Sequence, residues 1–139
     1  MDRPTFDAFC KTLPATFMVE QWGHAHVWKV GNETKNKVFA LSSFWTGKDD
    51  ETPESAPAHG IIFKVAPLSF ELLTEAAGIA QAPYFAKGQW VRVTQVSPLS
   101  DDDIAAYVRE AHRIMASQLT KKLQAELGLE TAVAGKGAL

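Results

Sequence analysis

Positive and aromatic side chains alternate with apolar ones in the segment QWVRVTQ, residues 89–95. In a strand with this alternation, Val91 and Val93 point towards the core, while Trp90 and Arg92 lie on the opposite face. Lysines accompany them on another predicted strand and around a predicted turn. Because cations neutralise phosphates and aromatic rings stack on bases, the pattern indicates a candidate nucleic-acid surface. Its residues are Lys29, Lys35, Lys37, Lys64, Trp90 and Arg92.

The same pattern also fits a plainer interpretation, in which solubilising lysines surround a tryptophan that a loop or a partner covers. Net charge does not decide between the two, because the whole chain carries −2 at pH 7. Residues 46–60 alone hold four acids and one lysine, a charge of −3, which leaves +1 for the remainder. The charge objection to an anionic partner therefore applies to one segment, which we expect to be an exposed acidic loop.

Two histidines, His24 and His26, have the spacing at which strand residues point the same way and could hold a metal. The other possible ligands, Cys10, His59 and His112, fall in a predicted helix, the acidic loop and another predicted helix. Structural metal sites need four converging ligands. The spacing therefore favours two hydrogen-bonded imidazoles, and we expect no metal or other cofactor.

Motifs typical of catalysis are missing from the sequence. It contains no G-x-S-x-G elbow, no phosphate-binding loop and no dinucleotide-binding glycine pattern. Cys10 shares an apolar helical stripe with Phe6 and Leu13, which favours a buried small side chain over a nucleophile. The carboxylates of residues 49–54 lie in a segment whose composition does not hold general acids and bases in place. We therefore expect no enzymatic activity.

The elements that position these residues follow from hydrophobic periodicity, caps and turn residues. Thr5 is the expected N-cap of the first helix, and Ser100 with Asp103 forms an acidic variant of the capping box before the last one. Strands are expected at residues 16–21, 25–30, 36–45, 61–65 and 89–95, and helices at 6–13, 67–78 and 101–127. This order indicates an α+β fold, a two-layer sandwich of an antiparallel sheet with helices on one face. The other face would be open or only partly covered.

Length and composition agree with one domain over residues 1–139, since 46% of the residues are hydrophobic and 22% are charged. The last residues, about 130–139, are expected to form a flexible tail. A single cysteine and the absence of a signal peptide or membrane span are typical of a cytoplasmic protein. We expect no contact with a membrane.

Several segments resemble the MmcQ/YjbR family in the same order, from about Phe6 to Leu123: FDAFCKTLP, the WG of residues 22–23, NKVFAL, IIFKVAP, KGQWVRV and SQLTKKL. The chain differs from the family pattern at Asn36, where members often have glycine, and at Ala111 and His112, where they have a Ser-aromatic pair. The resemblance implies a bacterial protein with a CyaY-like, frataxin-type fold and a sheet similar to the "double wing" of DNA-binding proteins. Frataxin-type iron binding is not implied, because the first predicted helix holds only the acid Asp7.

Together these observations predict a cytoplasmic, monomeric DNA-binding protein that uses the open sheet face and its turns. The five cations would contact phosphates, and Trp90 would stack on bases or wedge into a groove. The alternative is a non-catalytic adaptor for a protein partner or a small ligand, which would dock on an exposed Trp90. No residue is assigned to reading DNA sequence.

Overall fold

The computed structural model describes residues 1–45 and 58–134. Its strands are β1 (Thr16–Gln21), β2 (Ala25–Gly31), β3 (Asn36–Trp45), β4 (Ala58–Lys64), β5 (Ile79–Gln81) and β6 (Trp90–Thr94). Its helices are α1 (Arg3–Lys11), α2 (Pro67–Leu73), α3 (Asp101–Ser117), α4 (Lys121–Glu126) and α5 (Glu130–Ala134). The sequence-based prediction had found all of the strands except the three-residue β5.

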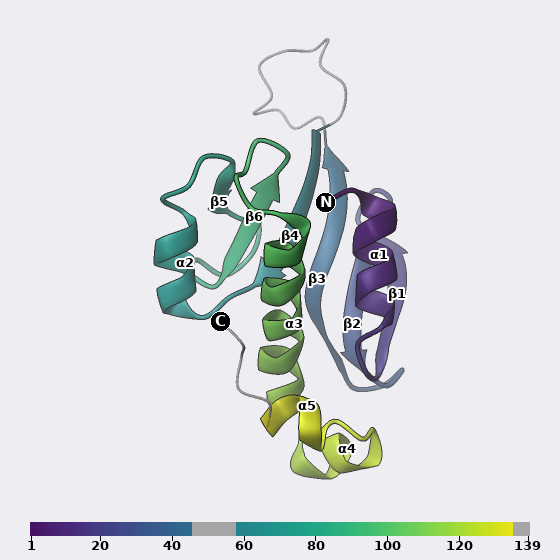
Figure 1. The fold of residues 1–139 in the computed structure, drawn as a ribbon. Coiled ribbons are helices and arrows are strands. Elements are labelled where there is room, and N and C mark those ends of the chain that lie inside the picture. The colour runs from purple at the N-terminus through teal and green to yellow at the C-terminus, as the bar shows by residue number, and fades with distance from the viewer. Residues whose placement is uncertain (46–57, 135–139) are drawn as a thin grey trace.

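The strands form one antiparallel sheet in the order β1-β2-β3-β4-β6-β5. Helices α1 and α3 lie side by side in front of the sheet in Figure 1 and cover one of its faces. We call this the inner face and the opposite one the outer face. The expected α+β fold, with helices packed on one side of an antiparallel sheet, is confirmed.

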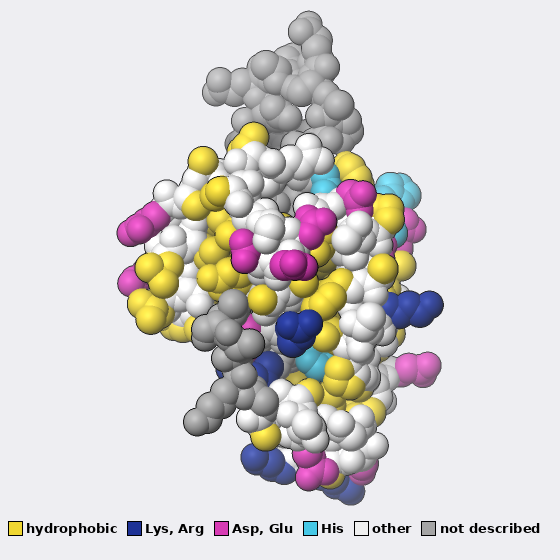
Figure 2. Space-filling model, viewed as in Figure 1, with side chains coloured by type: hydrophobic (Ala, Val, Ile, Leu, Met, Phe, Trp, Pro, Cys, Tyr) yellow, Lys and Arg dark blue, Asp and Glu magenta, His cyan; other side chains and the backbone are white. Residues whose placement is uncertain are grey.

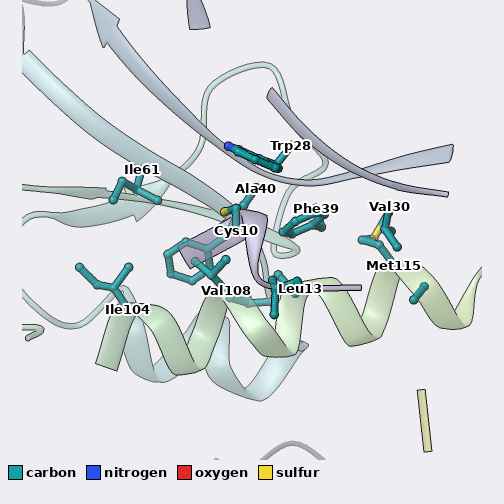
Figure 3. Packing of buried hydrophobic residues seen from close by; sticks show 14 of the residues in the cluster. Cys10, Leu13, Trp28, Val30, Phe39, Ala40, Ile61, Ile104, Val108 and Met115 are labelled. Atoms are coloured by element: carbon teal, nitrogen blue, oxygen red, sulfur yellow. The ribbon is translucent and has the colours of Figure 1, made fainter. Parts of the chain in front are cut away.

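The main core fills the space between the inner face and the two helices (Figure 3). Trp28, Phe39 and Ile61 come from the sheet, and Val108 comes from α3. Cys10 of α1 is buried among them, as its place in the apolar stripe predicted, and burial raises the pKa of its thiol. Such a thiol is a packing group rather than a nucleophile.

Several predicted boundaries were wrong. The first helix starts earlier than expected, because the carboxylate of Asp2 rather than Thr5 is its cap and accepts from the backbone N–H of Thr5 at 2.9 Å. The long helix expected over 101–127 is divided: α3 ends at Ser117, and Thr120 caps a separate α4 by accepting from the N–H of Leu123. The apolar period continues across this break, since Leu123 is still buried against the core. Periodicity alone therefore could not show it.

Two further expectations concern the segments of unusual composition. Residues 58–60, assigned to the acidic loop, begin β4, and residues 130–134, assigned to the tail, form α5. Residues 46–57 and 135–139, with the acids of the predicted loop, lie outside the described residues. The predicted helix after Pro67 ends at Leu73 rather than near Gly78.

A second, smaller apolar cluster lies on the outer face. It consists of Ala25, Val27, Leu41, Ile62, Ala82 and Trp90, with Val38 and Phe85 partly buried against it. The outer face is therefore partly covered at its centre, which is one of the two arrangements expected from the sequence.

Candidate nucleic-acid interface

Strand register determines which side chains the outer face carries. Lys29 pairs with Val38, Lys64 with Trp90 and Arg92 with Ile62, and all of these lie on the outer face. Among the strand residues that the structure describes, this face has three positive side chains, Lys29, Lys64 and Arg92, and no acidic one. The strands alone thus give the outer face a positive charge.

Four of the six predicted residues share this face, and two do not. Lys35 lies in the β2–β3 turn, where its backbone N–H donates to the side chain of Asn32 at 2.7 Å. Lys37 pairs with Val30, a residue of the inner core, so its side chain belongs to the helix-covered side of the sheet. Both lysines are exposed. They extend the positive surface around the sheet margin rather than across the face.

The lysines gather at one end of the sheet. Strands β2 and β4 end there, and β3 and β6 begin there, so Lys29, Lys37 and Lys64 lie at the same margin as the β2–β3 turn and the β5–β6 connection. That connection adds Lys87, which is exposed and was not among the predicted residues. We call Lys29, Lys35, Lys37, Lys64 and Lys87 the basic edge. Glu33, in the β2–β3 turn, is the acid that accompanies them.

Acidic side chains gather at the other end of the molecule. Helix α3 follows the end of β6 far from the basic edge, and its first turn holds the exposed Asp101, Asp102 and Asp103. Figure 2 shows acidic side chains grouped where α3 begins. They stabilise the helix, because carboxylates lie favourably at its N-terminus. The basic edge and this acidic turn therefore lie at opposite ends of the sheet, which the net charge of the chain does not reveal.

Trp90 lies on the outer face as predicted, but the prediction that it is exposed was wrong. Only 8% of its surface is accessible, because the ring of Phe85 lies against it with centroids 4.6 Å apart. Phe85 in turn meets Trp22 of the β1–β2 turn edge-on, at a centroid distance of 6.3 Å. We call Trp22, Phe85 and Trp90 the aromatic bridge. Alternation along β6 identified the face of Trp90 but not the connection that covers it.

The bridge joins two corners of the sheet that are far apart in strand order. The β1–β2 turn lies at one edge and one end, and the β5–β6 connection lies at the opposite edge and the opposite end. Right-handed strand twist bends one diagonal pair of corners towards the same face of a sheet. The contact between Trp22 and Phe85 shows that these two corners meet over the outer face.

Gln81 holds the β5–β6 connection in shape. Its side-chain amide nitrogen lies 2.8 Å from the carbonyl oxygen of Ala82, 3.2 Å from that of Phe85 and 3.4 Å from that of Ala86. Its side-chain oxygen accepts from the backbone N–H of Gly88 at 2.9 Å. One side chain thus closes the connection at both ends, so that Phe85 is presented from a defined loop.

Lys64 is a buried cation beneath the aromatic bridge. It is 9% exposed, its ammonium group donates to the side-chain oxygen of Gln89, and it lies 5.9 Å from the centroid of the Trp90 ring. Burial lowers the pKa of Lys64. No carboxylate lies within ion-pair distance of its ammonium in the part of the chain that the structure describes. A positive group held by neutral partners is suited to receive an anion.

The two histidines considered as metal ligands point to separate partners. His24 lies in the β1–β2 turn with φ of +72° and is 3.5 Å from Glu20, whereas His26 in β2 bonds to Asp7 at 2.7 Å. Only His26 lies in a strand, so the spacing that would align the two side chains does not apply. Across residues 1–45 and 58–134, no three His, Cys, Asp or Glu side chains are grouped as metal ligands.

A serine and a histidine that the sequence did not suggest as a pair lie close together. The hydroxyl of Ser42 is 2.7 Å from the Nε2 atom of His59, and it accepts from the guanidinium of Arg3 at 3.0 Å. Both residues are buried, and Arg3 also donates to the backbone oxygen of Ser42. Burial and the charge of Arg3 lower the pKa of His59. This arrangement fastens α1 to β3.

Comparisons with known proteins place the chain in a family. The YjbR family model matches residues 11–114. The chain belongs to the YjbR family. No curated protein matches the sequence. This YjbR protein is similar to solved structures from two bacteria, at sequence identities that establish the shared fold alone.

One of these structures is the crystal structure of Deinococcus radiodurans protein DR2400, with the domain DUF419: 23% identity, a TM-score of 0.72, and coverage of 96% of this chain and 92% of that one. A crystal structure of a Pseudomonas syringae protein shares 19% identity with a TM-score of 0.68, over 83% of this chain and 99% of that one. A solution structure from Pseudomonas syringae gives a TM-score of 0.64. In the YjbR protein, none of the described helices has both the length and the apolar character needed to cross a bilayer.

Proposed function

We propose that this YjbR protein binds DNA through the outer face and the basic edge. The observation that carries the proposal is the outer face itself, whose described strand residues include Lys29, Lys64 and Arg92 and no acid. Phosphate binding supplies most of the affinity of proteins for DNA. The proposed phosphate contacts are the predicted Lys29, Lys35, Lys37, Lys64 and Arg92, with Lys87 added.

Lys64 has a special place in this proposal. Its ammonium is held by Gln89 and Trp90, both neutral, so a phosphate would supply the negative partner that the described residues do not. An ion pair formed where water is largely displaced is stronger than one on an open surface. Lys35 and Lys87 would attract the polyanion from solution, because they are exposed.

The burial of Trp90 changes its proposed role. A ring with 8% accessibility supports Phe85 and Lys64 from below, and it is not available to stack on a base or to wedge between base pairs. The same burial removes the docking residue of the adaptor alternative. Binding of DNA thus depends on the cations of the outer face and on whichever rings are exposed beside them.

The wider family setting agrees with the proposal. The likeness of family sheets to a DNA-binding double wing, and to a frataxin-type fold, belongs to the proposal and is an inference from fold. Under it, the protein acts in the bacterial cytoplasm as a monomer, without catalysis and without a cofactor.

The test is fluorescence anisotropy of a labelled DNA duplex titrated with the protein between 50 and 200 mM salt. Affinity should fall with salt, with a slope of about −0.9 in log–log form for each phosphate neutralised. The double variant Lys35→Gln/Lys87→Gln should make this slope shallower by about 1.8. The matched control is Lys121→Gln/Lys122→Gln, which removes the same charge from exposed positions on α4. Equal effects of the two variants, or absence of binding at 50 mM salt to both the duplex and its separated strand, would refute the proposal.

A further inference from the structure

Two exposed aromatic rings lie beside the positive outer face. Trp22, in the β1–β2 turn, is 58% exposed, and Tyr84, in the β5–β6 connection, is 105% exposed. Large aromatic side chains are usually buried, since their burial contributes strongly to folding. Neither ring contributes much burial to this fold, so their exposure calls for another explanation.

The backbone at both rings adopts a conformation that L-residues rarely take. Trp22 has φ of +54° within a turn whose other residues, Gly23 and His24, also have positive φ, and Tyr84 has φ of +69°. Asparagine or glycine would occupy such positions with less strain. Strained residues of this kind cluster at binding sites, because the surrounding structure holds them in place.

The ring of Trp22 and the backbone at Tyr84 are held in defined positions. Trp22 is oriented by the edge-on contact with Phe85, which leaves more than half of its surface open. Tyr84 directly precedes Phe85, in the connection that the amide of Gln81 closes. A ring that is fixed before it binds loses little conformational freedom on stacking.

Aromatic rings and cations lie close together in the β5–β6 connection and on the strands beneath it. Tyr84 and Phe85 are followed by Lys87 in the same connection, and Phe85 packs on Trp90, which lies against Lys64. A positive surface with interspersed open rings is the arrangement with which proteins bind single-stranded nucleic acid, in which bases are free to stack on side chains. In a duplex, by contrast, the bases are paired and stacked on one another, so two exposed rings have no partner there.

We propose that the DNA bound by this protein is single-stranded, with bases stacking on Trp22 and Tyr84 while the backbone follows the basic edge and the outer face. This inference rests on the proposed DNA binding and specifies its substrate class. It assigns base stacking to two residues outside the predicted site and no longer to Trp90.

The experiment compares a labelled single-stranded oligonucleotide with the duplex of the same sequence, by anisotropy at constant salt. The wild type should bind the single strand at least about tenfold more tightly. Stacking of one base corresponds to about a 5- to 150-fold change in affinity. Trp22→Ala and Tyr84→Gly should each weaken single-strand binding by at least about fivefold, with an unchanged salt slope, because no phosphate contact is lost.

Matched variants separate stacking from folding. Trp22→Phe and Tyr84→Phe keep a ring and should retain most of the affinity. Leu68→Ala removes another exposed apolar side chain, from α2, and should have no effect. Tyr84→Gly replaces a fully exposed residue at positive φ, so thermal stability should change little and a loss of binding then reports the ring itself.

The outcomes distinguish this inference from the function on which it rests. If duplex and single strand bind equally well and the ring variants bind as the wild type does, this inference is overturned and DNA binding stands. If a preference for the single strand persists in Trp22→Ala and in Tyr84→Gly, the assignment of stacking to these rings is wrong. If neither form of DNA binds at 50 mM salt, both proposals fall together.

Discussion

Replacing Gln81 with glutamate should open the β5–β6 connection without unfolding the protein. The substitution keeps the shape of the side chain and the oxygen that accepts from Gly88, and it replaces the donating nitrogen with an oxygen. That nitrogen faces the carbonyl oxygens of Ala82, Phe85 and Ala86, at 2.8, 3.2 and 3.4 Å. A carboxylate oxygen would repel all three. Gln81→Glu therefore removes the contacts that hold the connection at its centre.

The expected magnitude follows from the number of hydrogen bonds lost. The amide has two hydrogens, so it makes two full bonds at most, each contributing about 1 kcal/mol. Their loss, about 2 kcal/mol, corresponds to roughly a 30-fold increase in local opening. The connection buries little, since Tyr84 is fully exposed and Phe85 is half-buried, so it opens more easily than the sheet beneath it.

Native-state hydrogen exchange measures this opening residue by residue. The amide of Gln89, which donates to the carbonyl of Ala86 at 3.3 Å, should lose protection by about 30-fold, while the amide of Phe63 in the core should change little. Gln89→Glu is the matched control: it adds the same charge in the same connection but keeps the oxygen that accepts from Lys64. Equal loss of protection in the two variants, or none in Gln81→Glu, would refute the role given to the Gln81 amide.

Three further substitutions test other parts of the fold. Asp7→Ala leaves the buried indole N–H of Trp28 without its acceptor at 2.8 Å and also removes the partner of His26, so it should cost about 2 kcal/mol and lower Tm by roughly 8 °C. The cost should be smaller in a Trp28→Phe background, where only the His26 contact is lost, and additive losses would contradict the bond assigned to Trp28. Gly31→Ala places a Cβ 2.2 Å from a backbone oxygen and should cost more than about 2 kcal/mol in urea denaturation, against about 1 kcal/mol for Gly88→Ala, where nothing lies within 4 Å. Burial lowers the pKa of His59, so the unfolded state binds the proton more readily than the folded state. The free energy of unfolding should therefore be constant above about pH 7 and fall as pH drops below about 6.5. This fall should be smaller in His59→Gln, and an unchanged pH profile would contradict the burial of the neutral imidazole.

The strands that position the interface could be predicted because apolar residues indicate their buried positions and turn-forming residues mark their ends. The segment from Asn36 to Trp45 was predicted with its observed bounds, since a run of apolar residues on both faces indicates a central strand. The same argument failed for β5, because Ile79–Gln81 is too short to show any period. The side chain of Gln81, the last residue of β5, nevertheless shapes the connection on which the interface depends.

The candidate site was only partly predictable, for a physical reason. Alternation along a strand shows which face a residue occupies, and it placed Lys64, Trp90 and Arg92 together correctly. It does not show what another part of the chain lays over that face. Phe85 covers Trp90 from the β5–β6 connection, and Trp22 meets Phe85 from a segment distant in sequence; alternation along a strand signals neither contact.

The twist of the sheet connects the corrected and the proposed features. Trp22 and Phe85 belong to opposite corners of the sheet in strand order, and twist bends such corners towards one face. Their contact places the open ring of Trp22 beside the face on which Phe85 covers Trp90. On the same face Lys64 pairs with Trp90 and lies away from any described carboxylate. Because Phe85 takes Trp90 out of reach of a ligand, the exposed rings beside this cation lie at the two corners rather than at the predicted residue.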